Sequence, residues 1–405
     1  MVCPGGRRSP SSRPARWLVL LLIALAACSS TKSASRTGPG PTVEDSSTTT
    51  LASTSTSTTP SASAPTVLSG PQGGPVPANF AAVSVTFVSL QEGWVLGTAL
   101  CGSPPCTSLV RTRDGGKSWA GVPAPRADLS VDQSPGVSRI RFADADNGWA
   151  FGPGLWATHD GGSHWSAVSL PGPDKGSKVW DLAAANGVGH AVVFGANGVR
   201  ILSSPVATDA WRASPTTVPV GAGPVPRAQL VVQGTTGWVV EVDRTVIGGA
   251  RLSGGAWAPW QPPCLDAGGP MVLSASTPSD LVAVCDEGVW TGDTPVTRAY
   301  VSSDGGTTFR PTKTPVPLST STNAAASAAA RTAVVAAGGS AVLVGTFDGG
   351  ATWSTVARGA PSDWTDLGFT NPSQGVAVEI PSDARAGSLL MTVDGGHTWN
   401  AVAFR

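Results

Sequence analysis

The sequence has few of the side chains that enzymes most often use for acid–base and nucleophilic chemistry. It contains one tyrosine, four histidines and six cysteines in 405 residues, and only 13% of its residues are charged. No basic run is present, and 26 Lys and Arg residues are balanced by 26 Asp and Glu residues. A nucleic-acid partner requires a positive surface that neutralises phosphates. The sequence therefore predicts no nucleic-acid partner.

Metal-binding patterns are missing as well. No two cysteines have the Cys-x-x-Cys spacing, with histidine nearby, that a structural zinc site would need. We therefore expect no metal and no other cofactor. Four of the cysteines instead form two local pairs, Cys101 with Cys106 and Cys264 with Cys285. Such pairs in an exported chain are ordinarily oxidised, so we predict two disulfide bonds.

Long apolar runs are missing apart from one segment near the N-terminus. Residues 17–27 are apolar and follow four arginines, but this run is too short to cross a membrane comfortably. The pattern is typical of a secretory signal peptide over residues 1–27. Its ending, Leu-Ala-Ala-Cys, resembles the bacterial lipobox, which implies cleavage before Cys28 and lipidation of that thiol. Ordinary secretion with an incidental cysteine is the alternative.

Residues 28–77 form a segment of different composition, rich in Ser, Thr and Pro. Such a composition cannot build a hydrophobic core, so it predicts a disordered tether. A flexible coil of about 50 residues reaches on the order of 40 Å. Removing the signal peptide leaves 22 basic against 26 acidic residues, so the mature protein is mildly acidic. These features predict a monomer that is exported and lipid-anchored to the outer side of a bacterial cell membrane.

Glycine is abundant, and much of it lies in one repeated turn. The pattern Ser/Thr-x-Asp-Gly-Gly-x-x-aromatic occurs five times. Its aspartates and closing aromatics are Asp114 and Trp119, Asp160 and Trp165, Asp304 and Phe309, Asp348 and Trp353, and Asp394 and Trp399. Trp211 and Trp257 keep the same interval without the Asp-Gly-Gly, so successive aromatics lie 46, 46, 46, 52, 44 and 46 residues apart. The chain is therefore built from seven repeated units.

Units of this length, with many short strands and turns, are typical of β-propeller blades. We predict an all-β fold, a seven-bladed β-propeller with four-stranded blades, over residues 78–405 and preceded by the disordered tether. The sixth blade is expected to end near Val356 and the seventh to begin near Trp364. The seventh blade contains four strands of its own, so the ring either closes without strand exchange or borrows a strand near Val67.

The repeated turn is interpreted as structural. An aspartate caps the backbone N–H groups of its own turn, glycine supplies positive φ, and the aromatic side chain fills the space between neighbouring blades. Calcium binding or catalysis is the alternative. Five equivalent carboxylates around a ring cannot converge on one substrate, and the dense acidic spacing of a calcium loop is missing.

The turn resembles the Asp-box, or BNR repeat, of sialidases, sortilin-type receptors and photosystem II assembly factors. The resemblance covers about residues 80–405, and Phe87-Val88-Ser89 followed by Glu92-Gly93-Trp94 is closest to the assembly-factor kind. It implies a propeller whose Asp-box turns lie on the face opposite the ligand site. Fold alone does not decide function.

If the ligand face opposes these turns, it is formed by the starts of the innermost strands. This places eight candidate ligand-binding residues on it: Arg139, Lys178, Trp180, Asp181, Arg227, Gln229, Trp364 and Asp366. Exposed tryptophan beside arginine is typical of protein-binding hot spots and of sugar-stacking surfaces. The alternative is that Trp180 and Trp364 are buried between blades, as tryptophan usually is.

The sequence favours a binding protein without chemistry of its own, an envelope scaffold or assembly factor that holds a protein or glycan. The alternative is a glycoside hydrolase of divergent sialidase type. Sialidase chemistry needs a tyrosine nucleophile, and the only tyrosine, Tyr300, stands four residues before Asp304, on the turn side. Other glycosidases need two facing carboxylates, for which the sequence offers Asp181, Glu241, Asp266, Glu287, Asp366 and Glu379.

Overall fold

The computed structural model describes residues 73–102, 105–130, 136–196, 198–218, 227–288 and 296–405. The predicted signal peptide, Cys28, the segment near Val67 and almost all of the predicted tether lie outside these residues. Within the described part, no helix is long and apolar enough to cross a membrane. One short 3-10 helix, η1 (Gly172–Asp174), accompanies the strands there.

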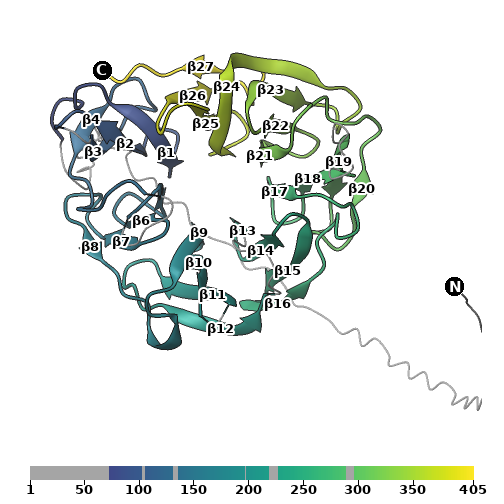
Figure 1. The fold of residues 1–405 in the computed structure, drawn as a ribbon, viewed down its shortest axis with the longest axis horizontal. Helices are drawn as coiled ribbons and strands as arrows, with labels where there is room; N and C mark the ends of the chain where they lie inside the picture. Colours follow the sequence, from purple (N-terminus) through teal and green to yellow (C-terminus); the bar gives the residue numbers. More distant parts are fainter. Residues whose placement is uncertain (1–72, 103–104, 131–135, 197, 219–226, 289–295) are drawn as a thin grey trace, which may run out of the picture. The chain divides into compact units, whose positions relative to one another are not determined.

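Residues Thr66–Arg405 form one compact unit, in which antiparallel sheets surround a central opening (Figure 1). The first sheet contains β1 (Ala81–Phe87), β2 (Gly93–Ala99), β3 (Cys106–Thr112) and β4 (Ala120–Val122). The second contains β5 (Arg139–Phe142), β6 (Gly148–Phe151), β7 (Leu155–Thr158) and β8 (Ser166–Ala167). The third contains β9 (Lys178–Ala185), β10 (Val188–Gly195), β11 (Gly198–Pro205) and β12 (Arg212–Thr217).

The remaining strands follow the same plan. The fourth sheet contains β13 (Arg227–Gln233), β14 (Thr236–Val242), β15 (Val246–Ser253) and β16 (Ala256–Trp260). The fifth contains β17 (Met271–Ala275), β18 (Leu281–Glu287), β19 (Val296–Ser302) and β20 (Arg310–Pro311). The last sheet has seven strands: β21 (Thr322–Ala326), β22 (Ala333–Ala337), β23 (Ser340–Thr346), β24 (Ser354–Phe369), β25 (Gly375–Pro381), β26 (Ser388–Thr392) and β27 (Asn400–Ala401).

The hydrophobic core is divided among the spaces between sheets. The second strands are apolar on both faces, as in Gly148–Phe151, where all four residues are buried. Each such strand therefore contributes to a cluster on either side of its sheet. Trp149 of the second sheet, for example, packs with Leu182 and Trp211 of the third. A ring of sheets lets short repeated units bury their apolar faces against both neighbours.

The Asp-Gly-Gly turns have the hydrogen bonds that the pattern predicts. In the first sheet, Asp114 Oδ1 accepts a bond from the Thr112 hydroxyl at 2.8 Å and another from the Ser118 N–H at 2.9 Å. The Thr112 hydroxyl also accepts from the Gly116 N–H at 2.9 Å. Both glycines of this turn have positive φ, 76° and 88°, which requires glycine's freedom. The turns at Asp160, Asp304, Asp348 and Asp394 repeat these bonds.

The last sheet differs from the prediction of two separate units. The chain does not leave the sheet after Val356; it continues as one strand, β24, through Trp364 to Phe369. The first part of β24 pairs with β23 and the later part with β25. The reason is local: Gly359-Ala360-Pro361 keeps an extended course and contains no turn, whereas residues 312–321 separate β20 from β21. The two predicted units are therefore joined as one sheet.

The ends of the described chain meet at the first sheet without exchanging a strand. β27 belongs to the last sheet, and β1 to β4 form the first sheet by themselves. The contact is made by the C-terminal residues: Arg405 O accepts a bond from Trp119 N at 3.2 Å, and the Phe404 ring lies 5.3 Å from the Trp119 ring. The first strands of successive sheets are also in contact around the ring, and β24 contacts β1.

The structure contains two disulfide bonds, between the cysteines that the sequence pairs. Cys101 is joined to Cys106 in the β2–β3 connection, and Cys264 is joined to Cys285. The second bond links the segment after β16 to β18, so it connects the fourth sheet to the fifth where the repeat interval lengthens to 52 residues.

Candidate functional site

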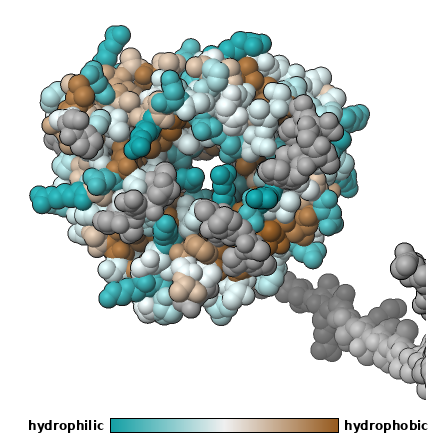
Figure 2. All heavy atoms as spheres, in the orientation of Figure 1, coloured by the Kyte–Doolittle hydropathy of each residue, from teal (hydrophilic) through white to brown (hydrophobic). Residues whose placement is uncertain are grey.

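The candidate binding face surrounds the central opening, where the innermost strands begin. β5 begins at Arg139, β9 at Lys178 and β13 at Arg227, so three basic side chains stand at corresponding positions on successive sheets. Figure 2 shows hydrophilic side chains gathered around this opening. The Asp-Gly-Gly turns follow the third strands, which puts them at the other end of each sheet. The prediction that these three residues and the turns lie at opposite ends is consistent with this topology.

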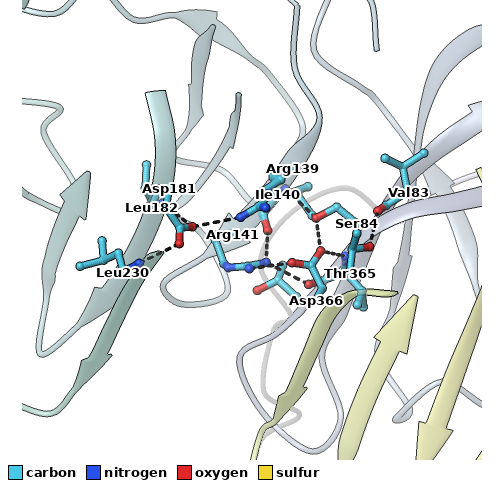
Figure 3. A network of polar contacts seen from close by, with 12 residues as sticks. Val83, Ser84, Arg139, Ile140, Arg141, Asp181, Leu182, Leu230, Thr365 and Asp366 are labelled. Carbon is cyan, nitrogen blue, oxygen red and sulfur yellow. Dashed lines mark hydrogen bonds and ion pairs between the residues drawn. The ribbon is translucent and has the colours of Figure 1, made fainter. Parts of the chain in front are cut away.

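Below the opening, Asp366 is the centre of a polar network that joins the last sheet to the first and second (Figure 3). Asp366 Oδ2 accepts bonds from the Ser84 hydroxyl and, at 2.9 Å, from Val85 N. Asp366 Oδ1 accepts a bond from Arg141 Nη2 at 2.7 Å. The Ser84 hydroxyl in turn accepts from Ile140 N at 3.0 Å. One carboxylate therefore ties three inner strands together.

The electrostatics of this network are those of a buried ion pair. Burial alone would raise the pKa of Asp366, but the Arg141 and Arg139 guanidiniums and the Ser84 hydroxyl outweigh it, so the pKa is lowered. The pKa of Arg141 is raised, because Asp366 outweighs the opposing effect of burial. Both groups are therefore charged at neutral pH, and their ion pair stabilises the contact between the inner strands.

Asp181 plays the corresponding part between the third and fourth sheets. Its Oδ2 accepts a bond from Leu230 N and its Oδ1 one from Leu182 N, both at 2.9 Å. Arg139 Nη1 lies 3.4 Å from Oδ1, so the same carboxylate also reaches the second sheet. The Asp181 side chain is buried, whereas that of Arg139 is 43% exposed. The Arg139 guanidinium is thus held by a buried carboxylate and is still accessible from solvent.

Similar polar clamps connect other strands of the ring. Gln229 forms two bonds with the backbone of Leu273, at 2.7 and 2.8 Å. Asp286 accepts from Thr322 N at 2.9 Å, and Asn323 Nδ2 donates to Trp364 O at 3.4 Å. The Gln229 and Asp286 clamps each join one sheet to the next, whereas Asn323 joins β21 to β24 within the last sheet. The innermost polar side chains therefore hold the ring together.

β-bulges set the orientation of Ser84, Asp181 and Asp366. The register between β1 and β2 shifts between Ala82 and Ser84, and β9 shifts against β10 beside Asp181. In β24 the shift falls between Thr365 and Gly368, and Asp366 there has φ of 48°, a rare value for a residue other than glycine. A bulge adds one residue to a strand and redirects its side chain. The clamps thus depend on local irregularities of the strands.

The eight predicted ligand-binding residues differ in their surroundings. Asp181, Gln229 and Asp366 are clamps, and Trp364 is a core residue: it is 2% exposed, and its indole donates to Ser340 O at 3.2 Å. The interpretation of Trp364 as an exposed stacking surface is therefore wrong, because its ring packs in the core of the last sheet with Leu343 and Leu390. Arg139, Lys178 and Arg227 remain on the surface.

Trp180 is half-buried. Its ring packs edge-on against Phe194 at 6.2 Å, and its Nε1 is buried without a hydrogen-bond partner among the described residues. It lines a small pocket together with Glu241 of β14. Glu241 is fully buried, and neither carboxylate oxygen has a partner in the described part of the chain. Burial, with Asp243 nearby, raises the pKa of Glu241 to about 8.

Two groups in the fifth sheet were not paired by sequence reasoning. The Tyr300 hydroxyl donates to Glu287 Oε1 at 2.7 Å, and Arg298 Nε donates to the same oxygen at 3.1 Å. Burial, together with Glu287, raises the pKa of Tyr300. The pairing could have been expected from strand alternation, since Arg298 and Tyr300 share one face of β19. Among the described residues, no group of three or more His, Cys, Asp and Glu side chains could hold a metal ion.

Comparison with known proteins identifies the fold and no family. No family model matches, and no curated protein matches. Among solved structures, YCF48 bound to D1 peptide is 20% identical with a TM-score of 0.51, over 81% of this chain and 99% of that chain. YCF48 from Cyanidioschyzon merolae is 15% identical with a TM-score of 0.52, over 79% and 97%.

A third solved structure, a Mycobacterium tuberculosis puromycin-hydrolyzing peptidase, is 14% identical with a TM-score of 0.52. The match covers 84% of this chain but 56% of that one. At these identities the likeness concerns the fold alone. The chain is thus similar in fold to β-propellers, and the expectation of an all-β protein with four-stranded antiparallel sheets is confirmed.

Proposed function

We propose that this protein is a binding module that holds a protein or glycan ligand over its central opening, without chemistry of its own. The observation that supports this proposal is that the acidic and basic side chains around the opening have different surroundings. The carboxylates Asp181 and Asp366 are buried and bonded to backbone and arginine, whereas Arg139, Lys178 and Arg227 face outward. A rim that presents cations above neutralised acids attracts an anionic segment. We favour an acidic stretch of a protein, and YCF48, which is similar in fold, binds a peptide in one solved structure.

The ring is best described as seven blades. We count the five four-stranded sheets and then divide the last sheet at β24, giving β21 to β23 with the first part of β24, and the later part of β24 with β25 to β27. The seven inner strands in this description form one series of contacts around the opening. The five turns are then Asp-boxes of an assembly-factor-like propeller.

The propeller is proposed to be a monomer, tethered outside a bacterial membrane. The apolar run at 17–27, the Leu-Ala-Ala-Cys ending at Cys28 and the Ser/Thr/Pro-rich segment support a lipoprotein with a flexible linker. Two disulfide bonds suit an oxidising compartment. An envelope scaffold or assembly factor combines these features.

The test is affinity capture from a solubilised envelope extract of the source bacterium, with the full chain as bait. The test variant carries Lys178→Glu and Arg227→Glu. The matched control carries Lys117→Glu and Arg212→Glu, which reverse one lysine and one arginine away from the opening. We expect one stoichiometric protein to be captured by the wild type and the control, and to be reduced at least tenfold with the test variant. Equal capture by both variants would contradict a site at the opening.

One contact favours the alternative of a glycoside hydrolase. Tyr300 bonded to Glu287 resembles a tyrosine nucleophile with its acidic partner. The raised pKa of Tyr300 disfavours the phenolate that such a nucleophile needs. Assaying the wild type and Tyr300→Phe with aryl glycosides and sialosides separates the two functions. Turnover that Tyr300→Phe abolishes would replace the binding proposal by the hydrolase.

A further inference from the structure

A polar pocket lies between the fifth and last sheets, at the end of the sheets opposite Arg139, Lys178 and Arg227. It has a volume of about 280 Å³. Three elements form it: the β17–β18 connection with Ser276 and Asp280, the Asp-Gly-Gly turn between β19 and β20, and the β21–β22 connection with Arg331. No part of the proposed function involves these residues.

Two arginines line the pocket and are available to a ligand. Arg310 and Arg331 are both exposed, and neither forms an ion pair with a carboxylate of the described chain. Arg331 is held in place: its Nη2 donates to Asp348 O, and its own carbonyl accepts from Gly349 N, both at 2.8 Å. Its remaining guanidinium N–H groups have no hydrogen-bond acceptor in the part of the chain that the structure describes.

Arg331 is unusual among the corresponding positions of the other sheets. The same bond to the first glycine of the turn is made by the carbonyls of Gln91, Asp146, Ser279 and Ser373. Of these five residues, only Arg331 has positive φ, 68°. A bulky residue in this conformation is rare and costs energy. The fold therefore places this one guanidinium against the pocket in a way that the other turns do not repeat.

The rest of the lining combines carboxylates, hydroxyls and an apolar wall. Asp304 is fully used by its turn, through the Ser302 and Thr308 hydroxyls and backbone N–H groups. Asp280 Oδ2 accepts from the hydroxyls of Thr277, at 2.7 Å, and Ser279, at 3.5 Å, while no described residue donates to its Oδ1. The Ser276 hydroxyl is buried without a partner among the described residues. Leu281, Val282 and Val301 form the apolar part.

The charges and hydrogen-bonding groups of the lining indicate the kind of ligand that fits the pocket. The lining contains two guanidiniums, of Arg310 and Arg331, and two carboxylates, of Asp280 and Asp304, so its charges balance and favour neither a simple anion nor a simple cation. Open donors on Arg310 and Arg331, an open acceptor on Asp280 and a hydroxyl on Ser276 match a neutral ligand with several hydroxyl groups. The apolar wall matches the C–H face of a sugar ring. The volume lies near the lower end of the range for small-molecule pockets, enough for one such ring.

We propose that this pocket binds one neutral sugar residue of a glycan. The proposal does not rest on the function assigned to the central opening, since the two sites share no residue and lie at opposite ends of the sheets. A protein with both would hold its macromolecular ligand at one end and a glycan at the other.

The test uses saturation-transfer difference NMR on the full chain, with glucose, galactose, mannose and N-acetylglucosamine as probes at millimolar concentration. Sodium sulfate and glycine are added as anionic and zwitterionic competitors. Two variants address the pocket: Ala330→Trp fills it from an exposed loop position, and Arg310→Ala removes a donor. Arg212→Ala, on the outer strand β12, is the control, and circular dichroism checks the folding of each variant.

We expect at least one sugar to bind to the wild type and to Arg212→Ala, and its affinity to fall at least tenfold in both pocket variants. Three results would overturn the proposal. These are the absence of binding by all four sugars, sugar binding that survives Ala330→Trp, and displacement of the sugar by sulfate or glycine at comparable concentration. Capture at the central opening is measured separately with Lys178→Glu and Arg227→Glu, so failure of one site leaves the other tested on its own.

Discussion

Individual carboxylates decide how firmly neighbouring sheets are joined, and Asp366 is the clearest case. Its bonds to Ser84, Val85 N and Arg141 span three inner strands. Arg141 forms its ion pair with Asp366, whose side chain is only 5% exposed, and Asp181 adds a smaller favourable charge interaction. Removing one member of a buried pair leaves the other without compensation.

We therefore predict that Asp366→Asn lowers the free energy of unfolding by about 3 kcal/mol. The double variant Asp366→Leu with Arg141→Met should lose less unfolding free energy than the sum of the losses in Asp366→Leu and in Arg141→Met, because neither charge is then left without its partner. Urea denaturation measures both effects. Asp383→Asn, in an exposed loop, is the control and should change stability by less than about 0.5 kcal/mol. Additive effects in the cycle would show that the pair is not coupled.

Glu241 differs from Asp366, since it is buried and neither of its carboxylate oxygens has a hydrogen-bond partner among the described residues. Its pKa of about 8 in the folded state, against 4.5 ordinarily, means that folding favours the protonated form. Between these values the unfolded chain releases the proton and the folded chain keeps it. The contribution of this group to stability is therefore largest below about pH 4.5 and declines as the pH rises to about 8.

We predict that Glu241→Gln removes this decline. The wild type should lose up to roughly 1.4 kcal/mol of unfolding free energy per pH unit over this window, relative to the variant. Glutamine keeps the size of the neutral acid, so packing is preserved. Denaturant titrations at pH 5, 6, 7 and 8 give the comparison. Parallel pH profiles for the two proteins would mean that Glu241 is ionised in the fold.

The Asp-Gly-Gly turns are the parts of the structure that sequence predicts best. The bonds made by their Asp and Thr or Ser side chains lie within eight consecutive residues, so the pattern and the geometry have the same local cause. The cysteine pairs were predictable for a similar reason, as each joins positions close in the chain. Trp364 and the clamps were not, because their orientation depends on bulges in β9 and β24 that pairing with another strand creates.

The turn carboxylates give the fold resistance to acid. Hydrogen bonds from the Thr308 side chain and backbone, with help from Ser302, lower the pKa of Asp304 to about 2. Burial opposes the shift at Asp394, but the bonds from Thr398 and Thr392 outweigh it and lower that pKa to about 2 as well. The stabilising effect of such groups is present above their unfolded pKa of 3.8 and is lost as the pH falls towards 2.

We accordingly predict that the turns stay intact at pH 3 and open only near pH 2. Hydrogen exchange of the Thr308 and Thr398 amides, which donate to these aspartates, reports the opening directly. In Asp394→Asn the Thr398 amide should exchange with no transition in this range, while the Thr308 amide serves as the internal control. Opening of both wild-type turns near pH 4 would contradict the low pKa values.

The ring as a whole depends on the place where the first and last sheets meet. Neither sheet borrows a strand from the other, so the junction relies on the Asp366 clamp, on a bridge between Ala82 and Gly387, and on the C-terminal residues. Phe404 packs against the apolar cluster that the two sheets share, with its ring 4.8 Å from Phe80 and 5.3 Å from Trp119. If one junction between sheets is much less stable than the others, the ring opens there before the rest of the molecule unfolds.

We predict that Phe404→Ala lowers the free energy of unfolding by about 2 kcal/mol and loosens the two sheets on either side of the junction. Hydrogen exchange should rise in β1 to β4 and in β25 to β27 before it rises in the second to fifth sheets. Phe347→Ala is the matched control: Phe347 stacks on His397 within the last sheet, at 3.6 Å, and does not reach the first. If both variants raise exchange only around the substituted residue, the clamps of the inner strands suffice to close the ring. If Phe404→Ala alone loosens both sheets, the C-terminal residues take the place of an exchanged strand.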